Sequence, residues 1–295
     1  MIPPEVAKTL GGAVTAAVPV SGGDICQAHR VTLDDGRTVF VKTRPGAPAD
    51  FFRTEARGLA ALAAAGGAPV PRVLAVTDDS LVLEWIEPGR PTVAAAAAFG
   101  AALAATHSAH PPHFGGDGDG YLGSLRLPNG PSASWPQLYA EQRVGPALRA
   151  AVERGRISVA DAASVQWVLA VLPELAGTPE PPALLHGDLW SGNVLWAASG
   201  PVHLIDPAVH GGHRETDLAM LALFGTPHLD RILAAYDAVY PLADGWRTRV
   251  ALHQLHPVVV HAALFGGGYG SQAGALARAA LARTTAAGQH LRQQG

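Results

Sequence analysis

The stretch "LLHGDLWSGNVLW", residues 184–196, places a histidine, an aspartate and an asparagine in a short polar loop between two apolar runs. Polar side chains beside buried segments are costly unless they have partners, so this loop calls for a ligand or a bracing network. Two short strands are predicted at 194–197 and 201–205, which favours a hairpin. A tight hairpin brings Asn193, before its first strand, close to Asp206, after its second.

The residue types in this loop suit phosphoryl transfer. Carboxylate and amide oxygens are the ligands that Mg²⁺ prefers, so Asn193 and Asp206 are the candidate metal ligands. Asp188 precedes Asn193 on the same loop and can accept a hydrogen bond from an attacking hydroxyl, as a catalytic base does. His186 is expected to brace the loop. A turn held by side-chain caps is the alternative for Asp188 and Asn193 alone, and the complete pattern H-G-D-x-x-x-x-N followed by I-D favours catalysis.

The bulk composition limits the classes of function. The chain has 295 residues, of which 48% are hydrophobic, and its net charge is −3. That charge gives no electrostatic reason to expect nucleic acid as a partner. No apolar run is long enough to span a bilayer, and the start of the chain lacks the pattern of a signal peptide, so no membrane association is expected. The single cysteine, Cys26, excludes an internal disulfide and is typical of a protein from a reducing cytoplasm.

The pattern along the chain predicts an α+β, bilobal architecture. Residues 1–87 form a small β-rich lobe with one helix at 49–67, and residues 88–295 form a larger, mainly helical lobe. The strands of the first lobe are expected at 13–21, 26–33, 37–43, 71–77 and 80–86. The second lobe is expected to have helices at 92–109, 135–152, 157–176 and over most of 215–290. The segment "EPGRP", residues 87–91, reads as the hinge, and 110–134 as a long loop.

The first lobe carries candidate residues for binding ATP. The sequence "SGGDICQAHR" joins two predicted strands through Gly22 and Gly23, and backbone N–H groups at such a turn, with Asp24, can approach a phosphate closely. A plain hairpin is the alternative. Lys42, in the strand "VFVKT", is expected to pair with Glu55 on the helix and to contact phosphate oxygens, whereas a solvated strand residue is the alternative for Lys42 alone.

The strand before the hinge and two groups of histidines are further candidates for a site. The strand "LVLEWIEPG" leads into the hinge, so the backbone of Glu84, Trp85 and Ile86 could pair with an adenine edge. Histidines at 107–113 and 253–261 are spaced at short intervals, but prolines interrupt both groups and no cysteine joins them. Structural or surface roles are therefore favoured over a metal site for these histidines.

Taken together, these motifs resemble the fructosamine kinase (ketosamine-3-kinase) family, relatives of aminoglycoside and choline kinases with a protein-kinase-like fold. "HGDLWSGN" is similar to the family's catalytic loop, and "DPAVHGGHRETDLAMLALFG" to its metal-binding segment. The resemblance implies ATP- and Mg²⁺-dependent phosphorylation of the sugar 3-hydroxyl of ketosamines, which are sugar adducts of amines or proteins. The phosphorylated adduct then loses its sugar, and the amine is recovered.

The resemblance also implies roles for particular residues. Asp188 would be the catalytic base, Trp190 would line the sugar site, and Asp217 would brace the catalytic loop. Apart from the resemblance, the negative charges of Asp117, Asp119 and Glu215 could attract the amine of the adduct, and a solvated loop is the alternative for Asp117 and Asp119. Asn193 and Asp206 would be the metal ligands, and Lys42 with Glu55 the ion pair.

Several alternatives stay open. Another small-molecule kinase of the same fold could act on an aminoglycoside, a choline-like amine or a sugar, and a nucleotide-binding module could lack catalysis. Cys26 is either a small half-buried side chain or a redox-sensitive thiol that pairs between chains. A monomer or a weak homodimer is expected.

Overall fold

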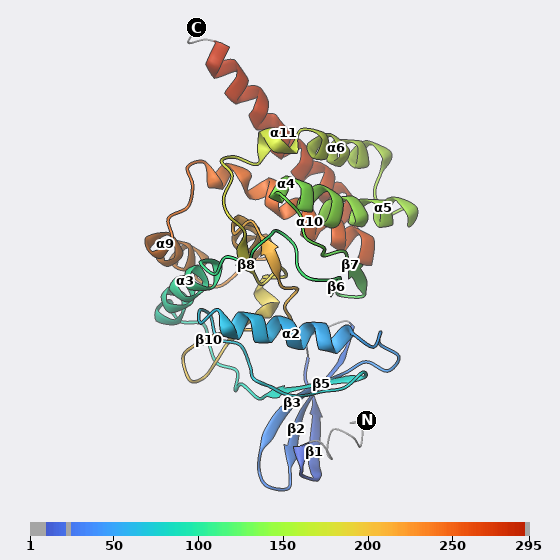
Figure 1. The fold of residues 1–295 in the computed structure, drawn as a ribbon, viewed down its shortest axis with the longest axis vertical. Coiled ribbons are helices and arrows are strands. Elements are labelled where there is room, and N and C mark those ends of the chain that lie inside the picture. Colours follow the sequence, from blue (N-terminus) through green and yellow to red (C-terminus); the bar gives the residue numbers. More distant parts are fainter. Residues whose placement is uncertain (1–9, 22–24, 293–295) are drawn as a thin grey trace.

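A computed structural model describes residues 10–21 and 25–292, with side chains described up to residue 282. A β-sheet forms one end of the molecule and a group of helices forms the other, with α2 (Phe51–Ala64) lying between them (Figure 1). This is the predicted α+β arrangement of a small β-rich lobe and a larger helical lobe.

The N-terminal sheet is antiparallel and has the strand order β1-β2-β3-β5-β4. Alternate side chains of β3 face opposite sides of the sheet. Val39 and Val41 face one small core, whereas Phe40 packs into the core under α2. Lys42 therefore shares the α2 side with Phe40. The strands are β1 (Val14–Pro19), β2 (Gln27–Leu33), β3 (Thr38–Thr43), β4 (Val73–Val76) and β5 (Ser80–Glu84).

Helix α2 owes its orientation to apolar residues at helical spacing. Phe52, Leu59 and Leu62 are buried, and this spacing places them on one face of the helix. Glu55 lies on the same face, three residues after Phe52. The packing that buries the helix against the sheet therefore also directs Glu55 toward β3.

The connection between the lobes follows β5. Pro88 forms a β-bridge with Ala197, and the backbone N–H of Gly89 donates to the carbonyl of Trp196. Helix α3 (Val93–His107) then begins after Thr92, whose hydroxyl caps it by accepting from the N–H of Ala95 at 3.1 Å. The predicted boundary at 87/88 falls in this connection and stays a prediction.

The C-terminal part is built mainly of helices (Figure 1). Its largest apolar core lies between α10, α11, α5 and α6, and a second core lies between α3, α9 and β9–β10. The helices after α3 are α4 (Trp135–Leu138), α5 (Gly145–Glu153), α6 (Val159–Ala170), α7 (Leu172–Leu175), α8 (Glu215–Leu223), α9 (Leu229–Val239), α10 (Trp246–Phe265) and α11 (Tyr269–Arg292).

Short hairpins and bridges complete the helical part. The predicted hairpin is present as β9 (Val194–Trp196) and β10 (Val202–Leu204). The prediction of an unbroken loop over 110–134 is wrong, because β6 (Gly120–Leu122) pairs with β7 (Leu125–Leu127) inside it. The pairing of β8 (Ala183–Leu185) with β11 (His210–Gly212) was not predicted either. Strands of three residues are too short to show an alternating pattern.

Two predicted helices are interrupted. The segment expected as one helix over 135–152 contains the π-helix η1 (Tyr139–Val144) between α4 and α5. The segment 157–176 breaks at Val171, between α6 and α7. Pro146 and Pro173 each lie in the first turn after the interruption. Proline lacks the N–H that would bond to the preceding turn, and it is favoured in the first turn of a helix, which fits a new start at each place. The expected interruption at Pro257 is absent, because α10 continues through it.

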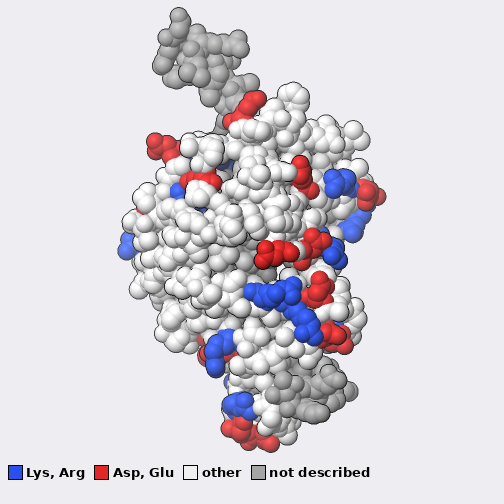
Figure 2. All heavy atoms as spheres, in the orientation of Figure 1, with Lys and Arg blue, Asp and Glu red and all other residues white. Residues whose placement is uncertain are grey.

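Charged side chains are unevenly distributed over the surface. On the face drawn in Figure 2, basic and acidic side chains intermingle along one edge, and a wide central area carries neither. Within the described residues, no helix is both long enough and apolar enough to cross a bilayer.

Helices α3 and α9 pack closely because Gly100 has no side chain. A Cβ atom on Gly100 would overlap the backbone carbonyl of Ile232 on α9. This contact matters for the loop at 186–193, because α3 carries His107 and α9 carries Tyr236, and these two side chains hydrogen-bond to each other.

We expect Gly100→Ala to lower the free energy of unfolding by about 1–3 kcal/mol, since an overpacked core must shift its backbone. Chemical denaturation followed by circular dichroism measures this. Gly268→Ala is the matched control, because no atom lies within 4 Å of the added Cβ. Equal loss of stability in the two variants would show that the α3–α9 contact tolerates a larger residue.

Candidate active site

A cavity with a volume of about 1100 Å³ lies between the two lobes. Both lobes contribute polar side chains to it, although these residues are far apart in the sequence. The predicted site residues that line it are Lys42 and Glu55 from the N-terminal lobe and Asp188, Trp190, Asn193 and Asp206 from the C-terminal lobe.

Lys42 lies between two carboxylates. Its Nζ is 2.9 Å from Glu55 Oε2 and 2.9 Å from Asp206 Oδ1. Burial by itself lowers the pKa of this amine, but the charges of Asp206 and Glu55 outweigh burial and raise the pKa above its ordinary value. Lys42 is therefore an ammonium at any physiological pH, and it joins α2 to the segment that follows β10.

Asp188 lies in the loop before β9, where hydrogen bonds with His186 and Asn193 hold it in place. His186 donates from Nε2 to the carbonyl of Ile205 at 2.8 Å and accepts at Nδ1 from the N–H of Asp188 at 3.2 Å. The Asn193 amide donates to Asp188 Oδ2 at 3.1 Å. Burial raises the pKa of Asp188 to about 7, and the charge of Asp206 adds to this rise.

Asp217, on α8, hydrogen-bonds to the backbone of the same loop. Its carboxylate is fully buried and accepts from the N–H groups of His186 at 2.7 Å and Gly187 at 3.0 Å. His107 Nε2 lies 3.2 Å from Asp217 Oδ2, and His107 Nδ1 lies 2.9 Å from the Tyr236 hydroxyl. The loop is thus tied to α8, α3 and α9.

Asn193 and Asp206 lie at the open end of the β9–β10 hairpin. Val194 pairs with Leu204 in the last register position, and the N–H of Ile205 donates to the carbonyl of Asn193. Because the Asn193 amide nitrogen is bound to Asp188, its Oδ1 is the atom left for a ligand. Asp206 keeps one carboxylate oxygen beyond the one that Lys42 contacts. These two oxygens fit the hard-ligand preference of Mg²⁺.

The position of the Trp190 side chain depends on a glycine two residues later in the chain. Its indole folds over Gly192, where any Cβ would overlap the ring. The side chain is 38% exposed in the cleft and meets the Phe224 ring edge-on at a centroid distance of 5.9 Å. Trp190 thus presents a ring face at the mouth of the cleft, two residues after Asp188.

The adenine contacts predicted for the backbone of Glu84, Trp85 and Ile86 stay a prediction. Glu84 accepts from Arg72 at 2.9 Å, and the Trp85 indole donates to Glu87 at 2.8 Å. Neither residue lines the cavity, and nor does Ile86. The phosphate loop cannot be compared with its prediction, because the residues in question are outside the described part of the chain: Gly22, Gly23 and Asp24.

The prediction that Glu215 attracts a substrate amine is wrong. Glu215 is buried at the start of α8, with only 3% of its side chain exposed, and Arg249 binds both of its carboxylate oxygens. Burial opposes ionisation, but contacts with His253 and Arg249 hold the pKa of Glu215 at about 2. Glu215 lies close to the motif in sequence, yet the first turn of α8 directs it toward α10.

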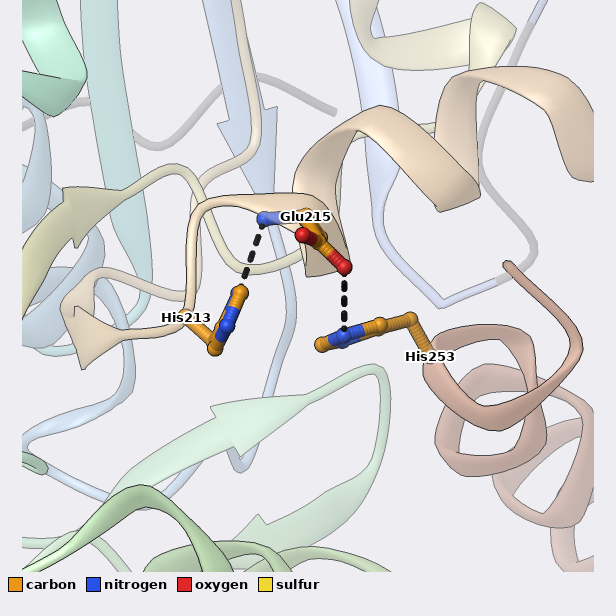
Figure 3. Close-up of side chains that lie close together, drawn as sticks. All are labelled: His213, Glu215 and His253. Carbon is orange, nitrogen blue, oxygen red and sulfur yellow. Dashed lines mark hydrogen bonds and ion pairs between the residues drawn. The ribbon is translucent and has the colours of Figure 1, made fainter. Parts of the chain in front are cut away.

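Figure 3 shows Glu215 between His213 and His253, which approach closely enough to suggest a cation site. His253 Nε2 is 3.3 Å from Glu215 Oε2, and His213 Nδ1 accepts from the N–H of Glu215 at 3.3 Å. Arg249 already neutralises the carboxylate. This arrangement is a buried ion pair with histidine neighbours, and the carboxylate is not free to bind a metal.

Cys26 lines the cleft and is half-buried. Burial raises the pKa of its thiol, and the nearby Lys42 charge only partly offsets this. A raised pKa lowers the thiolate fraction, so the environment favours the small half-buried side chain over a reactive thiol.

Further aromatic side chains line the cleft near Trp190: Phe224, His261, Phe265 and Tyr269. His261 on α10 makes ring contacts with Phe224, Phe265 and Tyr269 at centroid distances of 5.2, 5.6 and 5.1 Å. These rings continue the aromatic surface that Trp190 begins. Only the tertiary packing of α8, α10 and α11 brings them together. Asp117 and Asp119 also line the cleft, and Asp119 is paired with Arg126 at 2.9 Å.

Solved structures of other proteins share this architecture. A Thermobifida fusca protein provisionally named fructosamine-3-kinase is 48% identical, covers 94% of this chain and 97% of its own, and superposes with a TM-score of 0.89. A macrolide 2′-phosphotransferase type I, at 21% identity and a TM-score of 0.61, covers 92% of this chain and 94% of its own and shows the same fold. The protein-kinase-like fold is thereby confirmed.

Sequence relatives agree with this similarity. A protein of Enterococcus faecium named as a probable ketoamine kinase is 36% identical over 86% of this chain and 91% of its own length. The model of the family described as fructosamine kinase matches residues 5–283. The chain therefore belongs to the fructosamine kinase family.

Proposed function

We propose that the protein transfers the γ-phosphoryl group of ATP to the sugar 3-hydroxyl of ketosamines, the adducts formed by sugars on small amines or on proteins. Inorganic phosphate is then eliminated from carbon 3 of the sugar, and hydrolysis of the remaining sugar–amine linkage releases the amine. The observation that carries the proposal is the convergence of Lys42, Asp188, Asn193 and Asp206 on one cleft beside Trp190, in a chain of the fructosamine kinase family.

Lys42 is the proposed contact for ATP phosphates. Glu55 fixes the ammonium from α2, so its charge is already oriented before nucleotide arrives. Gly22, Gly23 and Asp24 are proposed to complete the phosphate contacts, and the backbone at Glu84, Trp85 and Ile86 to pair with adenine. A pre-oriented cation reduces the cost of ordering the site during phosphoryl transfer.

Asn193 and Asp206 are the proposed ligands of Mg²⁺. When bound, the ion would neutralise charge on the phosphates. The residues themselves supply one amide oxygen and one carboxylate oxygen at the open end of a rigid hairpin. Lys42 balances part of the Asp206 charge.

Asp188 is the proposed catalytic base. The Asn193 amide and the His186 ring fix its orientation. Its carboxylate accepts the proton of the attacking hydroxyl, or orients that hydroxyl toward the phosphate. Positioned groups of this kind contribute about 10²–10⁴-fold to rate.

Trp190 and Asp117 are the proposed contacts for the adduct. A flat indole can pack on the C–H face of a sugar, and Trp190 follows the proposed base by two residues in the chain. The Asp117 side chain is open to solvent at the cleft, where it can attract an ammonium. The alternative function is phosphorylation of another small alcohol, such as an aminoglycoside, a choline-like amine or a free sugar.

Asp188→Asn is expected to lower kcat with a ketosamine by about 10²–10⁴-fold, because the hydroxyl loses its proton acceptor. The affinity for ATP should change little, since Asp188 does not contact Lys42 directly. Steady-state ADP release and nucleotide titration measure the two effects. Asp78→Asn, an exposed aspartate on the N-terminal lobe, is the matched control. A near-normal rate for Asp188→Asn would contradict the assignment.

Asp206→Ala is expected to abolish the Mg²⁺ dependence of nucleotide binding, because it removes the carboxylate ligand. Titration of the enzyme with ATP, with and without Mg²⁺, measures this by calorimetry. Asp188→Asn serves as the comparison and should keep the Mg²⁺ dependence. The role given to Asp206 fails if Mg²⁺ strengthens nucleotide binding equally in both variants.

Trp190→Ala is expected to erase most of the preference for a ketosamine over its parent sugar and parent amine. The ratio of kcat/KM values should fall by the equivalent of about 1–3 kcal/mol, as for one lost buried contact. Trp167→Ala is the matched control, because Trp167 is 61% exposed on α6. Equal or better turnover of choline, an aminoglycoside or the free sugar by the wild-type enzyme would favour the alternative function.

A further inference from the structure

Arg143 is a buried cation that has no anionic partner in the part of the chain that the structure describes. It lies on the π-helix η1 and is 3% exposed. Its guanidinium donates only to neutral oxygens: the carbonyl of Pro128 at 2.6 Å, the carbonyl of Gln142 at 3.2 Å and the Asn129 side chain at 2.7 Å. Its Nε–H is buried and has no hydrogen-bond partner among the described residues.

Two other arginines whose side chains are little exposed have carboxylate partners. Arg214 is paired with Glu180 at 2.7 Å, and Arg249 is paired with Glu215. Burial lowers the pKa of Arg143 to about 9, with no carboxylate acting against this effect. The guanidinium is therefore still charged at neutral pH. An unpaired charge held away from water is strongly unfavourable, so its presence here indicates a compensating anion.

A second cavity lies beside Arg143. Its volume is about 100 Å³, and it is lined by Arg143, Gln142, Arg126 and His256 together with apolar side chains of β6, β7, α5 and α10. His256 is 4% exposed, and its Nε2 is also buried without a hydrogen-bond partner. Two orphaned nitrogens thus belong to side chains that line one small cavity. Buried polar atoms without partners usually indicate an unseen water or ion.

This cavity is distinct from the active-site cleft. Leu122, Leu127 and Val260 line both spaces and lie between them, whereas Arg143 and His256 line only the small one. The space is sufficient for a few water molecules or one small ion, and it is too small for a sugar or a nucleotide.

We propose that the small cavity binds one monovalent anion of about the size of chloride, held by Arg143 Nε–H and by His256. A single negative charge balances the single charge of Arg143, because burial lowers the pKa of His256 and of the neighbouring His210 and keeps both rings neutral. Neutral imidazole can still donate one N–H to the ion.

The anion would stabilise a wall of the active-site cleft. The guanidinium that it balances also holds Pro128 and Asn129, which follow β7. Asn129 lines the cleft, and its amide donates toward the carbonyl of Val209 at 3.5 Å. The anion therefore acts on the substrate side of the site through Arg143 and Asn129, without touching substrate.

A bromide soak tests the location of the ion. Crystals of the full-length protein are soaked in sodium bromide, and data are collected at the bromine absorption edge. The proposal predicts an anomalous peak within contact distance of Arg143 Nε and His256 Nε2. A water molecule in the cavity, or an empty cavity with bromide bound only elsewhere, would overturn the proposal.

Thermal unfolding tests binding in solution and does not depend on enzymatic activity. Sodium chloride is compared with sodium gluconate at equal ionic strength, because charge screening is the same but gluconate is too large for the cavity. Chloride should raise the melting temperature by about 2–4 °C and then saturate, and gluconate should not. Equal responses to the two salts would refute a specific site.

Variants connect the chloride response to these side chains. Arg143→Gln should lose the chloride-dependent rise in melting temperature. His256→Phe should weaken that rise, and it provides the test if Arg143→Gln does not fold. Arg154→Gln is the matched control, because Arg154 also donates to a backbone carbonyl but does not line the cavity. A full chloride response in His256→Phe and in any folded Arg143→Gln would contradict the proposal.

Discussion

The ion pairs of Lys42 are the interaction on which the active site depends. One ammonium contacts Glu55 from α2 and Asp206 from the far lobe, each at 2.9 Å. Coulombic attraction in a partly buried site is much stronger than on the surface, so these contacts fix the relative position of the two lobes. The helix, the sheet and the β9–β10 hairpin then place Asp188, Asn193 and Asp206 around a common cleft.

A second level of support lies behind the catalytic loop. Asp217 accepts two backbone N–H groups of the loop, and His107 and Tyr236 extend the network to α3 and α9. Because buried polar groups are costly when unpaired, a complete network favours one loop conformation. The close crossing of α3 and α9 at Gly100 is what brings His107 and Tyr236 within hydrogen-bonding distance.

The parts of the site that carry sequence motifs could be predicted from the sequence. The parts that depend on contacts between distant segments could not. The hairpin and the Lys42–Glu55 contact follow from local patterns: short strands around a turn, and a glutamate on the buried face of α2. The role expected for Glu215 does not hold, because its carboxylate is paired with Arg249 on α10, which lies far along the chain. The alanine-rich α3 gave no sign that His107 faces Asp217, and strands of three residues were too short to detect between 110 and 134.

The position of the new phosphate ester is the most direct test of the central claim that this cleft phosphorylates the sugar 3-hydroxyl of ketosamines. A ketosamine is incubated with ATP and Mg²⁺, and the product is followed by proton and phosphorus NMR. The account predicts a phosphate coupled to the proton on sugar carbon 3, followed by release of free amine. A phosphate on any other oxygen, or ATP turnover without phosphorylation of the ketosamine, would contradict it.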